Sequence, residues 1–421
     1  MPSFGEKNSV TKIVIVSGIQ IINNPRVVKE ANTLSKAGFD VEVIGAIFDK
    51  NSNISIQRTL QDVQWKHIPV IDLSIDRFKS KFDFLLARVR RSLSFSMIRW
   101  LGLESPNQLG YFVKPLFRIA KNRKADLYIV HLEQALWVGK KLIEQGYNVA
   151  IDVEDWYSED GLPQDRALRP IKLIKECESY LLNKSVYSTT TSKSLSTGLQ
   201  KAYKSTPPVV IYNSFPGENE DLENKIYLDR KDCSVPSIIW FSQTIGPGRG
   251  LEQLLAALNQ ISLPFELHIR GTSRPGYCDS LTESISCEFR KRIFFHSQVP
   301  QDELRARLNE HDIGYCGELS DCKNHDLTIS NKMMEYLCTG LAVIASDTKG
   351  QAEAAQLVPE GVFLFDQSSV DSLVKTLNRL LSNPSLLTNA KKMAEIGFKD
   401  HFSRPIFEKK LIELVNSATQ E

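Results

Sequence analysis

Short apolar segments alternate with longer amphipathic ones along the first half of the chain. Residues 12–16 (KIVIV) have the continuous apolar character of a buried strand. Pro25 can open a helix through residues 26–36 with its apolar side chains on one face, and Gly38 can end it. The same unit recurs, with strands expected at 41–46, 127–131, 148–152, 185–191 and 208–213 and helices at 134–146, 169–183 and 192–203. This alternation predicts a parallel sheet with helices on both faces.

A polar stretch with Pro and Gly, residues 216–234, interrupts this rhythm and predicts a linker between two domains. The alternation then restarts, with strands expected at 237–241, 265–270, 292–296, 312–316 and 341–346 and helices at 250–260, 301–310, 331–339, 369–381, 386–397 and 405–417. We therefore expect an α/β protein of two Rossmann-like, doubly wound parallel-sheet domains, residues 1–215 and 235–400, that face a central cleft. Such a cleft suits two substrates, one for each domain.

The overall composition excludes several functional classes. In the 421 residues, 52 Lys and Arg against 50 Asp and Glu leave a net charge of +2, which excludes a uniformly basic nucleic-acid-binding protein. No apolar run reaches the roughly 18 residues that a membrane-spanning helix needs, and the first residues lack the apolar stretch of a signal peptide. The seven Cys are scattered without a CxxC pair, and the seven His show no HxxxH spacing. We expect reduced thiols, no structural metal and a cytoplasmic location.

Positive charge is concentrated in residues 76–124, where 12 Lys or Arg stand against three acids. Apolar residues recur there at helical spacing and predict an amphipathic helix with a basic polar face, namely Phe78, Phe82, Leu85, Leu86, Val89, Leu93 and Met97. One interpretation is a surface for anionic lipid headgroups or for an acceptor that bears phosphates. The other is an ordinary domain helix whose apolar stripe packs inward while its Lys and Arg are solvated.

Two segments of the second half could bind an anionic ligand. Ser330 can cap a helix whose first backbone N–H groups would point at a phosphate, and Lys332 adds a full positive charge close to that end. Glu335 lies one turn further on and is suited to accept hydroxyl hydrogens from a diol such as a ribose. Residues 240–251 place a strand before a turn rich in Gly and Pro, in which Arg249 can bind an anion bidentately. Each pattern also fits solvated surface residues without a binding role.

Two segments of the first half lie at predicted strand ends. His131 falls at the C-terminal end of a buried strand, which is the edge where such sheets bind ligands. Residues 152–160 hold five acids and two aromatic side chains just after the next strand, a combination suited to a polyhydroxylated ligand. The alternatives are a hydrogen-bonded histidine at a strand end and a solvated acidic loop.

Taken together, these segments resemble GT-B glycosyltransferases related to glycosyltransferase family 4, also called glycosyl transferases group 1. Residues 330–346 (SNKMMEYLCTGLAVIAS) are similar to the family signature (P)NKxxEYxxxGxPVIAS. Residues 240–258 resemble its strand, turn and helix that grip the donor diphosphate, and residues 17–45 resemble its first strand–helix–strand unit. Residues 125–136 are similar to its aDvyHaHD stretch. The resemblance extends over nearly the whole chain in the family's order.

The resemblance implies roles for individual residues. Glu335 would accept the ribose hydroxyls of a sugar nucleotide, and Arg249 would neutralise the departing diphosphate with help from Lys332. His131 would sit beside the donor sugar and the attacking hydroxyl, so His131 and Arg249 are the expected catalytic residues. The expected donor-binding residues are Gly18, Ser242, Gln243, Arg249, Arg270, Val299, Ser330, Asn331, Lys332 and Glu335, and those on the acceptor side are Arg26, Asp155 and Trp156. Residues 401–421 would form a C-terminal helix that returns to the first domain.

The chain departs from the family pattern at three places. Leu327 stands eight residues before Glu335, where the family carries the first Glu of its paired acids, and Asp326 is its neighbour. Gln243 stands where many members carry an Arg and Arg249 where they carry a Lys, so Arg270 is a candidate to replace the missing phosphate cation. Glu154 and Asp155 occupy positions that often read His-Glu in relatives.

The resemblance implies a glycosyltransferase that moves a sugar from a nucleotide-diphosphate sugar to a hydroxyl of a saccharide or lipid-linked acceptor. Retention of anomeric configuration, no metal or cofactor, and a place in cell-surface polysaccharide or glycolipid synthesis are expected with it. Residues 76–124 would hold the enzyme peripherally on the inner face of the cell membrane. Two alternatives stay open, a two-domain sugar-nucleotide epimerase and a non-catalytic GT-B protein that binds a partner. Leu327 and Gln243 are the features that keep the second alternative open.

Overall fold

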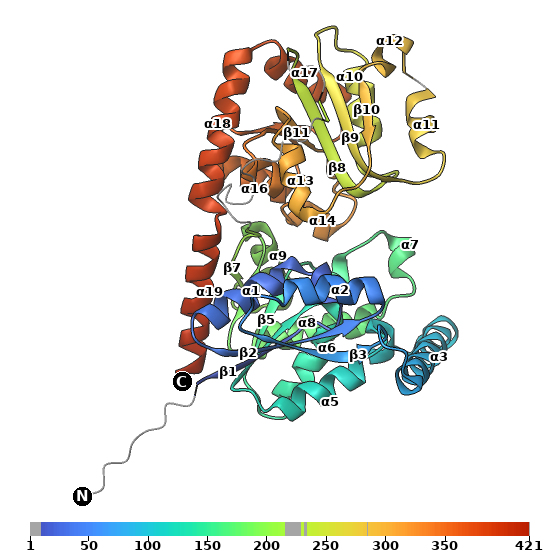
Figure 1. The fold of residues 1–421 in the computed structure, drawn as a ribbon, viewed down its shortest axis with the longest axis vertical. Coiled ribbons are helices and arrows are strands. Elements are labelled where there is room, and N and C mark those ends of the chain that lie inside the picture. The colour runs from blue at the N-terminus through green and yellow to red at the C-terminus, as the bar shows by residue number, and fades with distance from the viewer. Residues whose placement is uncertain (1–9, 215–228, 231–233, 284, 421) are drawn as a thin grey trace, which may run out of the picture. The chain divides into compact units, whose positions relative to one another are not determined.

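The structure is a computed structural model in which residues 10–214, 229–230, 234–283 and 285–420 are described (Figure 1). The chain divides into two compact units. The first unit comprises the residues up to Thr191, Ser196–Ile211 and the chain from Glu408 on, and the second comprises Ser192–Leu195 and Tyr212–Phe407. Most of the linker predicted at residues 216–234 lies outside the described residues.

The first unit is built on a seven-stranded parallel sheet with the strand order β3-β2-β1-β4-β5-β6-β7. The strands are β1 Lys12–Val16, β2 Asp40–Ile47, β3 Lys66–Asp72, β4 Leu127–His131, β5 Val149–Val153, β6 Ser188–Thr190 and β7 Val209–Val210. Successive strands are added on one side of β1 up to β3 and on the other side from β4 onward. Ligands of α/β sheets bind outside the carboxyl ends of the strands at such a reversal of strand order.

The helices of the first unit connect these parallel strands. They are α1 Pro25–Lys36, α2 Lys50–Thr59, α3 Phe78–Leu101, α4 Pro106–Leu109, α5 Val113–Arg123, α6 Leu132–Ile143, α7 Pro163–Arg166, α8 Ile171–Lys184 and α9 Lys193–Tyr203, with 3-10 turns η1 Ile21–Asn23 and η2 Tyr157–Glu159. Pro25 opens α1 as predicted, after an Asn24 cap whose side chain accepts from two backbone N–H groups. The helix α19, Arg404–Thr419, meets this unit where Lys410 Nζ donates to Val210 O at 3.3 Å.

The second unit contains a six-stranded parallel sheet in the order β10-β9-β8-β11-β12-β13. The strands are β8 Ser237–Ile245, β9 Glu266–Ser273, β10 Ile293–His296, β11 Ile313–Cys316, β12 Ala342–Ser346 and β13 Val362–Phe365. The helices are α10 Leu251–Leu258, α11 Tyr277–Glu283, α12 Cys287–Arg290, α13 Gln301–Leu308, α14 Lys323–Leu327, α15 Asn331–Cys338, α16 Lys349–Leu357, α17 Val370–Leu381 and α18 Pro384–His401. Strand order reverses between β8 and β11, so the loops after these strands mark the expected ligand edge.

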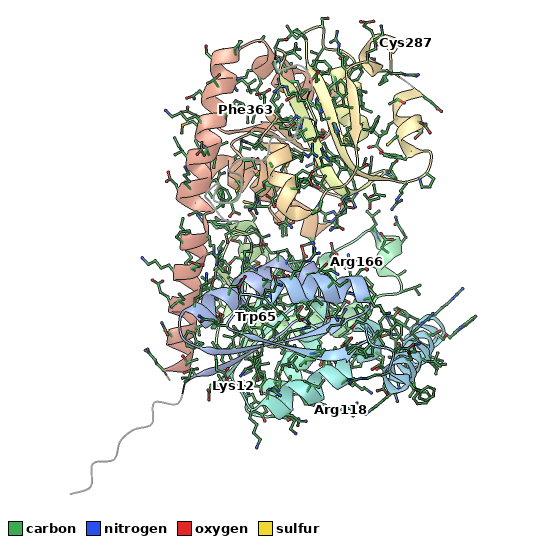
Figure 2. All side chains as sticks on the ribbon, viewed as in Figure 1. Lys12, Trp65, Arg118, Arg166, Cys287 and Phe363 are labelled. Atoms are coloured by element: carbon green, nitrogen blue, oxygen red, sulfur yellow. The ribbon has the colours of Figure 1, made fainter. Side chains whose placement is uncertain are left out.

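Helix α3 overturns the ordinary interpretation of the basic amphipathic segment. Its predicted apolar stripe does not pack inward, because six members of the stripe are exposed large apolar side chains, from Phe78 at 85% to Met97 at 41%. The opposite side of α3 packs on the unit through Ala87, which is buried, and Phe84, which contacts Phe112. Figure 2 shows many side chains of α3 projecting outward. The helix therefore has one packed side and one apolar side in solvent.

Candidate functional site

A cationic group lies at the N-terminal end of α15, as predicted. Ser330 caps the helix by accepting a hydrogen bond from the backbone N–H of Lys332 at 3.1 Å. The ammonium of Lys332 lies 2.5 Å from Glu318 Oε1 and 5.9 Å from the centre of the Trp240 ring. Burial acts to raise the pKa of Glu318, but Lys332 outweighs burial and holds that pKa below its ordinary value. A partly buried carboxylate thus accompanies the cation that the sequence assigned to phosphate.

Glu335 lies on the buried side of α15, one turn beyond the helix end. It is 3% exposed, and its Oε2 accepts a hydrogen bond from Nε of Arg305 on α13 at 2.9 Å. A buried carboxylate with a charged partner holds a defined orientation, as a group that accepts hydroxyl hydrogens must. Arg305 was not predicted, because no local pattern links it to a residue 30 positions further along the chain.

The turn after β8 carries the second predicted cation. Arg249 is exposed, and its Nη1 donates to Ser242 Oγ at 2.9 Å, while Gln243 is exposed nearby in sequence. Gly250 adopts φ 76°, and a Cβ there would collide with the carbonyl oxygen of Gly317, which follows β11. The glycine therefore lets the two loops at the strand-order reversal approach each other closely. Arg249 and Ser242 lie at the ligand edge of this sheet.

Arg270 occupies a different environment from the one expected of a phosphate ligand. It is buried, its Nη1 donates to Ser297 O at 2.7 Å, and it forms an ion pair with Asp229. Burial lowers the pKa of Arg270, against the raising effect of Asp229. These contacts give Arg270 a structural role beside Asp229. Val299 is partly buried and packs against the apolar core beneath α15.

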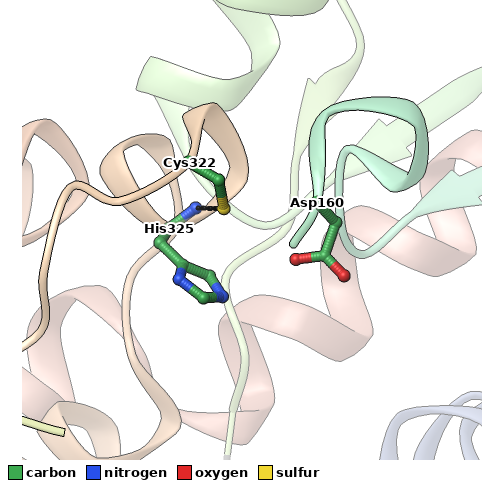
Figure 3. Close-up of side chains that lie close together, drawn as sticks. All are labelled: Asp160, Cys322 and His325. Carbon is green, nitrogen blue, oxygen red and sulfur yellow. Dashed lines mark hydrogen bonds between the residues drawn. The ribbon is translucent and has the colours of Figure 1, made fainter. Parts of the chain in front are cut away.

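The segment that departs from the family's paired acids forms α14. Cys322 caps this helix, and its Sγ accepts from the backbone N–H of His325 at 3.5 Å (Figure 3). Asp326, the neighbour of Leu327, lies 2.5 Å from the ammonium of Lys349 and accepts from Ser320 Oγ at 3.1 Å. Asp326 is thus held by Lys349.

His131 lies at the end of β4 in the first unit, where the sequence placed it, but inside a buried cluster of charges. The side chain is 1% exposed, its Nε2 lies 2.5 Å from Glu30 Oε2, and its Nδ1 lies 3.0 Å from Glu154 Oε1. Burial acts to lower the pKa of His131, but Glu30, Glu154 and Asp152 outweigh it and raise that pKa to about 10. An imidazolium whose two N–H groups both donate to carboxylates has no nitrogen left to accept a proton. In this form His131 is a fixed cation and not a general base.

The expected acceptor-side residue Arg26 belongs to the same cluster. Its guanidinium binds Asp152 through two nitrogens, at 2.5 and 3.1 Å, and donates to Ile211 O at 2.9 Å. Although burial acts to raise it, Arg26 and His131 lower the pKa of Asp152. His131, Asp152 and Glu154 present ligand atoms within 4.8 Å of one another and could in principle hold a metal ion. The guanidinium of Arg26 already fills the cationic role beside Asp152.

The other predicted residues of the first unit have separate surroundings. Trp156 is buried, and its Nε1 donates to Tyr203 OH at 3.2 Å, whereas Asp155 lines a cavity. Gly18 adopts φ 77°, and a Cβ there would lie 2.9 Å from the side chain of Leu116. Glycine is therefore required for the first loop to pack.

Glu30 is the member of the charge cluster that sequence reasoning missed. A signal was available, because Arg26 and Glu30 are four residues apart and share the buried face of α1 with Val27, Ala31 and Leu34. Two opposite charges on an otherwise apolar helix face indicate a buried ionic partner.

The second unit matches a known protein family. Residues 235–383 match the sequence profile described as glycosyl transferases group 1. These residues belong to the glycosyl transferases group 1 family. The matched range contains Ser242, Arg249, Ser330, Lys332 and Glu335. The predicted resemblance is confirmed, and the chain carries a glycosyltransferase domain. No curated protein matches the chain in sequence.

Solved structures show that the whole chain has the GT-B fold. It is similar to sucrose-phosphate synthase from Thermosynechococcus elongatus, with 15% identity, 97% of this chain and 98% of that chain covered, and a TM-score of 0.70. It is also similar to HepE of Anabaena in complex with UDP, with 14% identity, 97% of this chain and 100% of that chain covered, and a TM-score of 0.67. A third similar structure is WaaG, a glycosyltransferase involved in lipopolysaccharide biosynthesis, with 12% identity, 95% of this chain and 98% of that chain covered, and a TM-score of 0.56. The predicted fold class is confirmed. Within the described residues, no helix combines the length and apolar character needed to cross a membrane.

Proposed function

We propose that the protein is a retaining, metal-independent glycosyltransferase that moves a sugar from a nucleotide-diphosphate sugar to a hydroxyl of a saccharide or lipid-linked acceptor. The observation that carries the proposal is the N-terminal end of α15 in the glycosyl transferases group 1 segment. There the backbone N–H groups and Lys332 offer positive charge, and Glu335 offers a buried, oriented carboxylate one turn further on. HepE, which has the same fold, binds UDP, and this favours a uridine nucleotide as the first candidate.

The proposed chemistry uses charge that is fixed before the reaction. The bond between the anomeric carbon and the β-phosphate oxygen breaks, and the hydroxyl oxygen of the acceptor bonds to that carbon. The hydroxyl proton passes to the departing nucleoside diphosphate. Negative charge grows on the β-phosphate, and Lys332, Arg249 and the start of α15 stabilise it. This set of cations replaces the metal ion of other transferases.

Helix α3 supports a place for the enzyme on the inner, anionic face of the cell membrane. The helix has 24 residues and carries six Lys or Arg against one Asp. It also exposes Trp100 at 77% and Leu93 at 60%. An apolar stripe flanked by cations is the pattern of a helix that lies in a lipid interface and contacts anionic headgroups. A membrane-bound acceptor and a product in cell-surface polysaccharide or glycolipid synthesis fit this location.

A thermal-shift screen against UDP-, GDP-, ADP-, CDP- and TDP-sugars tests the donor assignment. At 100 times Kd a ligand should stabilise the folded state by about 2.7 kcal/mol. We expect one nucleotide class to give such a shift in EDTA as well as in Mg²⁺. Glu335→Ala should abolish the shift, and Glu360→Ala, an exposed control in the same unit, should keep it. No shift with any donor would favour the non-catalytic alternative.

Incubation with the preferred donor separates transfer from epimerisation. A transferase releases the nucleoside diphosphate when an acceptor is present, whereas an epimerase returns a nucleotide sugar of changed configuration. Mass spectrometry and proton NMR of the products distinguish the two outcomes.

A further inference from the structure

A cavity of about 440 Å³ lies in the first unit, within the range of roughly 300–1,000 Å³ typical of small-molecule sites. Its walls include Ile19 after β1, Leu132 after β4 and Asp155 after β5. It therefore lies at the carboxyl ends of the strands on both sides of the reversal of strand order, where α/β sheets bind ligands. The packed side of α3 closes another wall with Arg91 and Phe95.

Two polar groups of the cavity wall have no hydrogen-bond partner in the part of the chain that the structure describes. Tyr157 is 6% exposed, and its hydroxyl makes no hydrogen bond to any described residue. Nε of Arg91 is also buried without a hydrogen-bond partner among the described residues, and its guanidinium lies 4.5 Å from the centre of the Tyr111 ring. A buried donor without a partner is rare in folded proteins and calls for an explanation such as a ligand.

The backbone of the cavity wall is strained at one position. Leu132 adopts φ 67°, a conformation that a branched side chain rarely takes. Strain of this kind gathers at ligand sites, where the surrounding structure enforces it. Leu132 follows His131 directly, so the buried charge cluster fixes the strand end from which the strained residue departs.

The side chains of the cavity select among ligand classes. Glu133, Asp155 and Asp160 bring three carboxylates against the two guanidinium groups of Arg91 and Arg169, and Arg169 already pairs with Glu133 at 2.6 Å. This excess of acids disfavours a phosphate or another anion. Carboxylates accept hydroxyl hydrogens, while the Tyr157 hydroxyl and the guanidinium groups can donate to hydroxyl oxygens. A ligand with many hydroxyl groups satisfies both kinds of partner.

We propose that this cavity binds an uncharged pyranose ring of the acceptor, with Tyr157 and Arg91 as its hydrogen-bond partners and Phe95 against its apolar face. The proposal rests on the proposed function for the reaction, and it names the acceptor at this cavity as a neutral saccharide. The same helix that supplies Arg91 and Phe95 exposes the apolar stripe on its other side. A saccharide carried by a membrane lipid fits this arrangement, because the sugar would enter the cavity on the packed side of α3 while the apolar stripe contacts the membrane that holds the lipid.

Saturation-transfer NMR with methyl glycosides of glucose, galactose, mannose and N-acetylglucosamine tests the proposal on the full chain. We expect at least one glycoside to bind saturably and Tyr157→Phe to weaken it by about tenfold. Because this hydroxyl donates to none of the residues that the structure describes, Tyr157→Phe should not lower the unfolding temperature. Tyr147→Phe, a control outside the cavity, should leave both quantities unchanged. A loss of affinity without a loss of stability is a result that a purely structural tyrosine would not give.

Three results would overturn the proposal: no saturable binding of any glycoside, equal weakening in Tyr157→Phe and Tyr147→Phe, or loss of stability in Tyr157→Phe without loss of affinity. Donor binding, measured by thermal shift on the same preparation, separates this failure from that of the proposed function. Donor binding without glycoside binding rejects the cavity assignment only. Glycoside binding without donor binding rejects the proposed glycosyl transfer and leaves a saccharide site.

Discussion

Lys332 is neutralised before any ligand arrives, because Glu318 holds a negative charge 2.5 Å from its ammonium. A diphosphate must share the cation with this carboxylate, and two anions close together repel each other. We expect Glu318→Gln to tighten binding of the preferred nucleoside diphosphate by about tenfold, or about 1.4 kcal/mol. Isothermal titration calorimetry measures this change. Glu288→Gln, which removes an exposed charge from the same unit, is the matched control. Weaker binding by the Glu318 variant would instead show that this carboxylate contacts the ligand.

His131 makes the stability of the protein depend on alkaline pH. Its pKa in the folded state, about 10, lies above the ordinary value of 6.5, so its contribution is fully present below pH 6.5 and is lost as the pH rises to 10. Burial raises the pKa of Glu178 to about 7, and the corresponding contribution is already lost by pH 8. We therefore expect the unfolding temperature of the wild type to fall between pH 8 and 10, and that of His131→Gln to fall less.

Calorimetric scans of both proteins across this range provide the measurement, and their difference cancels the titration of surface Lys and Tyr. A constant difference from pH 8 to 10 would contradict a protonated His131. Should His131→Gln fail to fold, Glu30→Gln offers a second route, because removing that carboxylate should lower the pKa of His131 and shift the loss of stability to lower pH.

The role of a residue was predictable only where neighbouring positions in the sequence indicate it. The cap of Ser330 and the position of Lys332 follow from their spacing at a helix start, and the structure reproduces both. The partners of His131 and Glu335 could not be read in this way. Glu30 lies 101 residues from His131 and Arg305 lies 30 residues from Glu335, so only the folded sheet brings them together.

At the scale of elements, α3 makes a testable surface. Its apolar side chains at Phe82, Leu85 and Leu93 are about half exposed or more, so replacing all three with Ser removes no core packing. If the stripe enters a lipid interface, each side chain adds about 1 kcal/mol or more of apolar transfer energy. We expect the triple variant to lose at least about tenfold in binding to vesicles of phosphatidylcholine with phosphatidylglycerol, measured by co-sedimentation.

The control variant Leu168→Ser with Val186→Ser removes two exposed apolar side chains elsewhere in the first unit and should bind vesicles like the wild type. Binding by the wild type should weaken in high salt and on phosphatidylcholine alone, because the Lys and Arg of α3 attract anionic headgroups. Equal binding by the triple variant and the wild type would remove α3 as the membrane contact.

Elements were predictable where strands are buried on both faces. The central strands β1, β4, β8 and β11 read as continuous apolar runs, and the structure contains all of them. The two strands without a counterpart in the prediction, β3 and β13, are edge strands of their sheets. β3 (KHIPVID) mixes polar residues and Pro into its run, which an edge strand tolerates because it has one neighbour.

The fold of the whole molecule was easier to predict than its chemistry. The period of strand and helix, repeated in two halves, is enough to specify two parallel sheets, because a parallel connection requires a crossover. The direction of α3's apolar stripe was not predictable by the same reasoning. Helical spacing shows that Phe78, Phe82 and Leu85 share a face, but it does not show whether another element covers that face.

At the scale of the whole reaction, the fixed cations predict that turnover does not require a metal ion. If Lys332, Arg249 and the first N–H groups of α15 carry the charge of the departing diphosphate, removal of divalent ions should leave turnover with the preferred donor within about twofold. Nucleoside diphosphate release in EDTA, compared with release in Mg²⁺ and Mn²⁺, measures this directly. Lys332→Ala is the informative companion, because it removes a fixed cation and should lower turnover by about 100-fold. If Mg²⁺ restored that variant while leaving the wild type unchanged, a metal ion would be filling the place of Lys332. Loss of wild-type turnover in EDTA would instead show that the fixed cations are insufficient and that the reaction requires a metal ion.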